Sequence, residues 1–341
     1  MRNILNTLAV LLAVACLANG QESSYKLSDK VKLGGEGGWD YLNADPSTGM
    51  LFISRGTHVQ VMDMEKKTLK ADIPNTNGVH GIALAHEFGK GYISDGRDTA
   101  VTVFDLRDFK TIKVVKIAGL NPDAIIYDDA SKRVFTFNGR SSDATAIDAA
   151  SDSIVGTVPL GGKPEFAQGD GEGNIYVNIE DKSTIASFDA KTLKVIKTWS
   201  IAPGEEASGL AIDRKHHLLF SVASNKKMIV SDYTAGKVVA DVPIGEGPDA
   251  AGFDPETQLA FSSNGRDGTV TVVHEDAPDK FTVLENVKTQ QSARTMSLDL
   301  KTHRIYLSAA EFGKAPEPTK ENPRSRPPMI PGSFTILILS R

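Results

Sequence analysis

Two stretches of the sequence share one layout, DAIIYDDASKRVFTF at residues 123–137 and DAAGFDPETQLAFSS at residues 249–263. Each contains two runs in which apolar and polar residues alternate, separated by a polar turn, which is typical of paired β-strands. Asn-Gly-Arg follows both stretches, at 138–140 and 264–266. A third alternating run and a fourth that ends in a Gly-rich link complete the pattern, which predicts a repeating unit of four short strands.

The unit recurs along the chain at intervals of 40 to 45 residues, measured between positions that correspond to Asp123. These positions are occupied by Asp40, His80, Glu165, Ser208, Asp249 and Arg294. Seven repeats of four short strands predict an all-β, seven-bladed β-propeller with four antiparallel strands per blade. Helical periodicity is nearly absent after the first twenty residues.

The last unit, which starts at Arg294, contains only three strands, while an additional strand is predicted at Tyr25–Leu33. Pairing this N-terminal strand with the C-terminal one would leave no open edge in the ring, and unpaired edges promote aggregation. We therefore expect residues 21–341 to form a single, monomeric propeller domain that is closed by its N-terminal strand.

The first twenty residues resemble a secretory signal peptide, with Arg2 ahead of an apolar segment and Ala18-Asn19-Gly20 ahead of a cleavage site. This predicts export to the periplasm or the extracellular space. Residues 12–16 also fit a loose lipoprotein signal, which would attach the protein to a membrane through Cys16. The sequence favours simple cleavage after Gly20, which removes Cys16, the single cysteine, and lipidation at Cys16 is the alternative.

Composition excludes several function classes. The formal charge of −5 argues against bulk nucleic-acid binding, which needs a basic face. A single cysteine excludes a disulfide framework and a Cys-x-x-Cys-His haem site. No Gly-x-Ser-x-Gly nucleophile motif is present.

Two further segments resemble a known family. IYVNIEDKSTIASFD at 175–189 with KTLKVI at 191–196, and VVADVPIGEGPD at 238–249, are similar to the YVTN-repeat, YncE-like propellers. The resemblance implies an exported propeller, and its members mostly lack an assigned reaction. Related propellers also serve as subunits of periplasmic redox enzymes.

Strand direction in an up-and-down blade places the start of the first strand and the end of the second on one face, here called the top face. Charged residues of both signs converge there, which makes the mouth of the channel the default binding site. The candidate ligand-binding residues are Asp40, His80, Asp123, Arg140, Glu165, Asp249, Arg266 and Arg294. We expect Arg140, Arg266 and Arg294 to contact an anionic or polar ligand, and Asp40, Asp123 and Asp249 to orient them.

Metal binding is the alternative for the same residues. His80, Glu165 and Asp249 could hold a divalent ion, and the acidic positions of the ring, with Asp40 and Asp123, could hold Ca²⁺. The same carboxylates could instead be neutralised by Arg294 and Arg140, which the sequence favours. No cofactor is therefore expected. Aspartates also recur at the end of the third strand. We expect them to accept hydrogen bonds from the backbone of the following turn, which is a structural role. They are Asp63, Asp105, Asp148, Asp189 and Asp232.

A Pro-rich segment at 312–332 interrupts the last unit and is predicted on the top face, as a lid or as a disordered insertion. The sequence thus predicts an exported, non-catalytic propeller that binds a small molecule or an exported protein. The alternatives are a metal-dependent enzyme or accessory subunit of a periplasmic redox enzyme, and a structural envelope protein.

Overall fold

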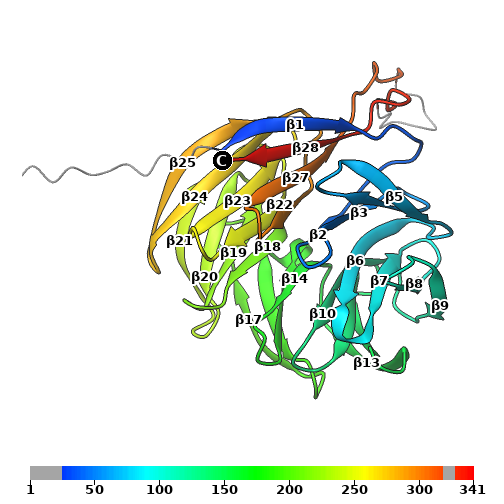
Figure 1. Ribbon diagram of the computed structural model, residues 1–341. Helices are drawn as coiled ribbons and strands as arrows, with labels where there is room; N and C mark the ends of the chain where they lie inside the picture. The colour runs from blue at the N-terminus through cyan, green and yellow to red at the C-terminus, as the bar shows by residue number, and fades with distance from the viewer. Residues whose placement is uncertain (1–24, 318–326) are drawn as a thin grey trace, which may run out of the picture.

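The computed structural model describes residues 25–317 and 327–341, which form seven four-stranded antiparallel sheets arranged around a ring (Figure 1). The predicted seven-bladed, all-β propeller is confirmed. The proposed signal peptide, the lipidation site at Cys16 and part of the Pro-rich segment lie outside the described residues. No helix in the described part of the chain has the length and apolar character that a membrane crossing requires.

Each blade is a run of consecutive strands, except the last. Blade 1 contains β2 (Leu42–Asp45), β3 (Met50–Ser54), β4 (Val59–Asp63) and β5 (Thr68–Ile73). Blade 2 contains β6 (Val79–Ala85), β7 (Lys90–Asp95), β8 (Ala100–Asp105) and β9 (Thr111–Lys116), with the 3-10 turn η1 (His86–Phe88). Blade 3 contains β10 (Pro122–Asp128), β11 (Arg133–Asn138), β12 (Asp143–Asp148) and β13 (Ser153–Pro159).

Blade 4 contains β14 (Pro164–Gly169), β15 (Asn174–Ile179), β16 (Thr184–Asp189) and β17 (Val195–Ser200), with the 3-10 turn η2 (Glu180–Lys182). Blade 5 contains β18 (Ala207–Asp213), β19 (Leu218–Ala223), β20 (Lys227–Asp232) and β21 (Lys237–Pro243). Blade 6 contains β22 (Pro248–Asp254), β23 (Leu259–Asn264), β24 (Thr269–Ala277) and β25 (Lys280–Lys288). Blade 7 contains β26 (Met296–Asp299), β27 (Arg304–Ala309), β28 (Thr335–Ser340) and β1 (Lys26–Lys32).

The first strand of each blade lies at the channel and the fourth lies at the rim. Burial follows this order, because middle strands such as β19 and β23 are buried along their whole length, whereas β9 and β17 at the rim are mostly exposed. The core consists of apolar clusters between neighbouring blades, so each blade is stable only against its neighbours.

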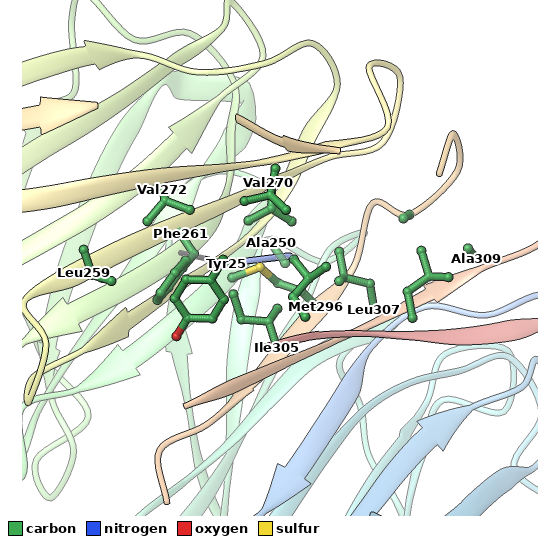
Figure 2. Close-up of a cluster of buried hydrophobic side chains, with 14 residues drawn as sticks. Tyr25, Ala250, Leu259, Phe261, Val270, Val272, Met296, Ile305, Leu307 and Ala309 are labelled. Carbon is green, nitrogen blue, oxygen red and sulfur yellow. The ribbon is translucent and has the colours of Figure 1, made fainter. Parts of the chain in front are cut away.

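The ring closes through its two ends, as predicted. β1 pairs antiparallel with β28, from Lys26 opposite Ser340 to Lys32 opposite Thr335. Just before β1, Tyr25 is buried beside Phe261 of blade 6, with ring centroids 5.3 Å apart in an edge-to-face arrangement (Figure 2). Its hydroxyl donates a hydrogen bond of 2.7 Å to the carbonyl of His303. The N-terminal segment therefore supplies both backbone pairing and core packing to the last blade.

The aspartates that recur at the ends of third strands bond the following turn, as predicted. Asp63 Oδ1 accepts from the amides of Glu65 and Lys66, at 3.1 and 2.8 Å. Asp232 Oδ1 accepts from two amides in the corresponding positions of blade 5. These carboxylates are occupied by the backbone, which accounts for their recurrence without any functional role.

The described ends of the Pro-rich segment approach each other beside the top face. Phe312 and Met329 form an antiparallel bridge, and the Gly313 amide donates to the Pro328 carbonyl at 2.9 Å. The Phe312 ring lies 6.0 Å from that of Trp39, measured between centroids. Residues 318–326 lie outside the described part of the chain, so the choice between lid and insertion stays a prediction.

Candidate functional site

The residues predicted around the top mouth lie at corresponding places of the seven blades. Each belongs to the first strand of its blade or lies two positions before it, and first strands run side by side along the channel. We call the set the mouth ring: Asp40, His80, Asp123, Glu165, Ser208, Asp249 and Arg294. Because every blade has the same layout, side chains that are more than 250 residues apart in the sequence lie in one site.

Arg294 joins two carboxylates of the mouth ring. Its Nη2 lies 3.0 Å from Asp40 Oδ1, and its Nη1 is hydrogen-bonded to Asp249 Oδ2. Burial opposes the charge of Arg294, but Asp249 and Asp40 raise its pKa above the usual range. Although Arg294 lowers the pKa of Asp249, burial dominates and raises it overall. One arginine thus compensates one side of the ring, as the sequence predicted for Arg294.

His80 lies between two further acids of the ring. Its Nδ1 is 2.6 Å from Asp40 Oδ2 and 3.5 Å from Asp123 Oδ1. Burial opposes protonation of His80, but the hydrogen bond to Asp40 and the charge of Asp123 raise its pKa overall. The pKa of Asp40 is lowered despite burial, because both His80 and Arg294 donate to it.

The opposite side of the ring holds more acid than base. Lys163 Nζ lies 2.6 Å from Glu165 Oε1 and is also hydrogen-bonded to Glu180. Burial and the charge of Asp123 raise the pKa of Glu165 to about 8, from an ordinary value of 4.5. Burial likewise raises the pKa of Asp123 to about 6, from 3.8. At neutral pH Glu165 therefore retains its proton, whereas Asp123 is mostly ionised.

An aromatic pair lies beside these acids. The rings of Tyr41 and Phe166 stack with centroids 4.5 Å apart and an interplanar angle of 28°. Tyr41 follows Asp40 in blade 1, and Phe166 follows Glu165 in blade 4. Blades 1 and 4 lie across a ring of seven from each other, so the pair spans the central channel.

These groups enclose a polar cavity of about 230 Å³ at the top mouth. Its lining residues are Asp40, Tyr41, Asp123, Glu165, Phe166, Glu180, Ser208, Asp249 and Arg294. A space of this volume accommodates a small organic ligand or the end of a longer side chain. Carboxylates on the walls and aromatic rings beside them are the chemistry that recognises a cation.

The three predicted arginines are not brought together. Arg140 is exposed, and within residues 25–317 and 327–341 its side chain has no hydrogen-bond or ion-pair partner. Arg266 is 78% exposed and lies 3.4 Å from Glu246. Arg266 and Arg294 do line one shallow hollow of about 350 Å³. The structure thus places Arg140 away from the ring carboxylates that the sequence assigned to it.

The predicted metal ligands are also distributed differently. In the described residues, His80, Glu165 and Asp249 do not converge within 4.8 Å, whereas the ligand atoms of Asp40, His80 and Asp123 do. Any metal at this mouth would therefore use the blade 1–3 side of the ring.

Sequence reasoning missed four residues of the site: Tyr41, Phe166, Lys163 and Glu180. Tyr41, Phe166 and Lys163 lie within two positions of a predicted ring member, and Glu180 follows the end of a second strand. Strand direction, which assigned residues to the top face, could therefore also have identified these four. The stacking of Tyr41 on Phe166 had no sequence signal, because it depends on which blades face each other across the channel.

The opposite mouth of the channel differs in chemistry. A larger cavity of about 590 Å³ lies there, between the ends of β18, β22 and β26. Its walls are mostly apolar, with Ile212, Phe253 and Leu298 among them, and Asp213 lies at its edge. The cavity at the top mouth is therefore lined mainly by polar groups, and the cavity at the bottom mouth mainly by apolar surface.

No protein-family model matches the chain, and no curated protein sequence matches it. Solved structures share the fold. A chain of the Kuenenia stuttgartiensis hydrazine synthase aligns with a TM-score of 0.69 and 14% identity, over 80% of this chain and 92% of that one. A chain of the mitotic checkpoint complex aligns with a TM-score of 0.76 and 10% identity, over 100% of this chain and 99% of that one. U3-55K aligns with a TM-score of 0.74 and 10% identity, over 92% of this chain and 99% of that one. At these identities the likeness shows the propeller fold alone.

Proposed function

We propose that the protein is an exported, non-catalytic propeller of the YVTN-repeat, YncE-like type that binds a ligand at its top mouth. The ligand class best supported is a small organic ammonium ion, or the ammonium group of an exported protein partner. The observation that carries this proposal is the cavity in which Asp123 and Glu165 lie beside the stacked rings of Tyr41 and Phe166.

Charge distribution favours a cation over the anion expected from the sequence. Arg294 is already engaged by Asp40 and Asp249, and Arg140 lies outside the cavity. Among the residues that the structure describes, the remaining acids pair with no basic side chains except His80 and Lys163; these acids are Asp123, Glu165 and Glu180. An ammonium group would supply the missing positive charge and would meet the faces of the aromatic rings.

The raised pKa values of Asp123 and Glu165 support the same ligand class. Burial and mutual repulsion disfavour the charged carboxylates, so without a bound cation Glu165 keeps its proton up to about pH 8 and Asp123 up to about pH 6. A bound ammonium ion would stabilise the charged forms and displace the protons. Binding of the ligand is therefore expected to release protons near neutral pH.

The test is thermal melting of EDTA-treated protein at pH 8 with ethylammonium, choline or acetate. We expect ethylammonium or choline to raise the melting temperature and acetate to have no effect. Glu165→Gln should abolish the rise, and Arg266→Ala, a matched control outside the cavity, should preserve it. Stabilisation by acetate that Arg266→Ala removes would favour the anion site instead.

A second candidate function is a metal-dependent one, as an enzyme or as an accessory subunit of a periplasmic redox enzyme. The convergence of Asp40, His80 and Asp123 favours it. Stabilisation of EDTA-treated protein by Ca²⁺ or Mn²⁺, lost in Asp123→Asn, would support that function over ammonium binding.

A further inference from the structure

A second cluster of acid and imidazole groups lies away from the top mouth, at the junction of blades 5 and 6. Asp213 ends β18, His216 belongs to the turn that follows, and Glu275 lies in β24 of the neighbouring blade. His216 Nδ1 is 2.8 Å from Asp213 Oδ2 and 2.6 Å from Glu275 Oε1. The side chains of Asp213 and Glu275 are only 4% and 1% exposed.

The hydrogen bonding of this cluster is incomplete. A ring nitrogen carries at most one proton, so His216 Nδ1 cannot give each carboxylate a full hydrogen bond. Asp213 Oδ1 accepts from the Lys215 amide, which leaves Oδ2 facing the cluster. Glu275 Oε2 is buried and has no hydrogen-bond donor within the described residues. Two buried carboxylates therefore share one histidine, and an oxygen remains unsatisfied.

Neighbouring basic side chains do not neutralise these carboxylates. Arg214 donates to the Gly169 carbonyl at 2.8 and 3.0 Å, and His217 Nδ1 lies 2.9 Å from the Tyr233 hydroxyl. Among the residues that the structure describes, His216 is the sole basic side chain paired with Asp213 or Glu275. A buried carboxylate without compensation is costly, which points to a further positive charge.

Comparison between blades shows that Glu275 is an exception to the repeat. Its amide donates to the carbonyl of Gln258, and equivalent amides at the end of the third strand make the same bond in five other blades. The residues at those equivalent positions are Met64, Leu106, Ala149, Ala190 and Tyr233. The fold thus needs an apolar or aromatic residue there, and an acid is not required by the blade.

His216 is a second exception at the same place. The position three residues after the aspartate is a threonine in blades 1 and 7, where Thr48 and Thr302 donate to the Oδ2 atoms of Asp45 and Asp299, at 2.5 and 2.6 Å. In blade 5 a histidine replaces this hydroxyl, and the acid from blade 6 meets it. Two independent departures from the repeat therefore coincide at one point.

We propose that Asp213, His216 and Glu275 bind a divalent transition metal ion, with Zn²⁺ as the best match, that joins blade 5 to blade 6. One imidazole nitrogen and two carboxylate oxygens, all within 4.8 Å of one another, are a donor set that Zn²⁺ accepts at about 2.0–2.2 Å. Two negative charges balance the ion. Any proton on His216 Nδ1 or on the two carboxylates leaves to solvent, because the metal needs these lone pairs.

The site is partly open to solvent. Asp213 lines the cavity of about 590 Å³, and the His216 side chain is 23% exposed. A water molecule could therefore reach the ion as a fourth ligand. The competing arrangement is a proton shared by the three side chains, supported by the raised pKa of Glu275, which burial and Asp213 cause.

The experiment is calorimetric titration of untagged, EDTA-treated protein with Zn²⁺ at pH 7.5, together with melting curves. An Asp123→Asn background removes the cluster at the top mouth, so that only the second site is measured. We expect micromolar or tighter binding with one ion per chain, and a rise in melting temperature of several degrees at saturation. Co²⁺ in place of Zn²⁺ should give a visible absorption spectrum typical of mixed nitrogen and oxygen ligation.

Glu275→Ala separates a metal site from a structural role, because alanine occupies the equivalent position in blades 3 and 4. We expect this variant to melt at or above the parent temperature in EDTA and to lose the Zn²⁺-dependent rise. His86→Gln, which alters another histidine–aspartate pair at a turn, should retain that rise. Absence of binding in the parent, or equal binding in Glu275→Ala, would overturn the proposal whatever happens at the top mouth.

Discussion

Tyr41 and Phe166 stack face to face across the channel, with ring centroids 4.5 Å apart, although they come from the first and the fourth blade. Each directly follows a member of the mouth ring, Asp40 or Glu165. The pair therefore couples the acidic rim of the top mouth to an aromatic surface, and this combination defines the proposed cation site.

Removing one ring of this pair should impair both stability and binding. Phe166→Ala removes stacking and apolar contacts and is expected to cost about 2–4 kcal/mol of unfolding free energy, with loss of ammonium binding. Tyr41→Phe keeps the aromatic face and should bind normally. Urea unfolding and calorimetry measure the two effects. Normal ammonium affinity in Phe166→Ala would contradict a role of the aromatic pair in recognition.

The three arginines should differ sharply in their contribution to stability. Arg294→Ala leaves Asp40 and Asp249 without their shared partner and should cost about 2 kcal/mol, reduced by the partial exposure of the guanidinium. Arg266→Ala removes one exposed ion pair and should cost less than about 1 kcal/mol. Arg140→Ala should change stability as little. Equal losses in urea unfolding for all three would refute this ranking.

Stability should respond to pH through Glu165. Its pKa is raised from 4.5 to about 8, so the folded protein holds this proton more tightly than the unfolded chain. Stability from Glu165 is complete below pH 4.5 and is lost as the pH rises to about 8. Glu165→Gln should therefore raise the melting temperature at pH 9 by several degrees relative to the parent, and not at pH 5. A uniform shift at both values would show that the charge is not responsible.

Closure of the ring should be essential for the whole domain. Deletion of residues 25–35 removes the pairing of β1 with β28 and the buried ring of Tyr25. We expect a loss of several kcal/mol and association of the exposed β28 edge. Melting and size-exclusion chromatography measure these effects. Tyr25→Phe is the milder control, because it removes only the hydrogen bond to His303. A monomeric deletion variant with parental melting would be incompatible with this closure.

The fold could be predicted from the sequence because each blade repeats the same local signals. Spacing of Asp123 and its counterparts gave seven blades, and the missing fourth strand after Arg294 gave the closure by β1. Positions within the mouth ring followed from strand direction alone. The ion pairs within the ring could not be predicted in this way, because the partners of Arg294 and His80 depend on side-chain rotamers and lie in other blades.

Arg140 shows where the repeat argument fails. Its Asn-Gly-Arg turn joins the second and third strands of blade 3 at the top face, as predicted. The Arg140 side chain is nevertheless exposed to solvent instead of lining the channel. The sequence identified which loops face the mouth, but not how far each side chain reaches inward. Glu275 shows the converse, because its departure from the repeat was visible in the sequence and became informative only beside His216.

The most direct test of the proposed cation site is calorimetric titration of EDTA-treated protein with ethylammonium at pH 6 and at pH 9. The ligand stays charged at both values, since alkylammonium groups have a pKa of about 10.4. Glu165, with a pKa of about 8, loses its proton between these values, and Asp123, with a pKa of about 6, completes its ionisation. We predict affinity at least tenfold higher at pH 9, with protons released on binding at intermediate pH. Absence of binding at both values, or tighter binding at pH 6, would contradict a carboxylate site for cations.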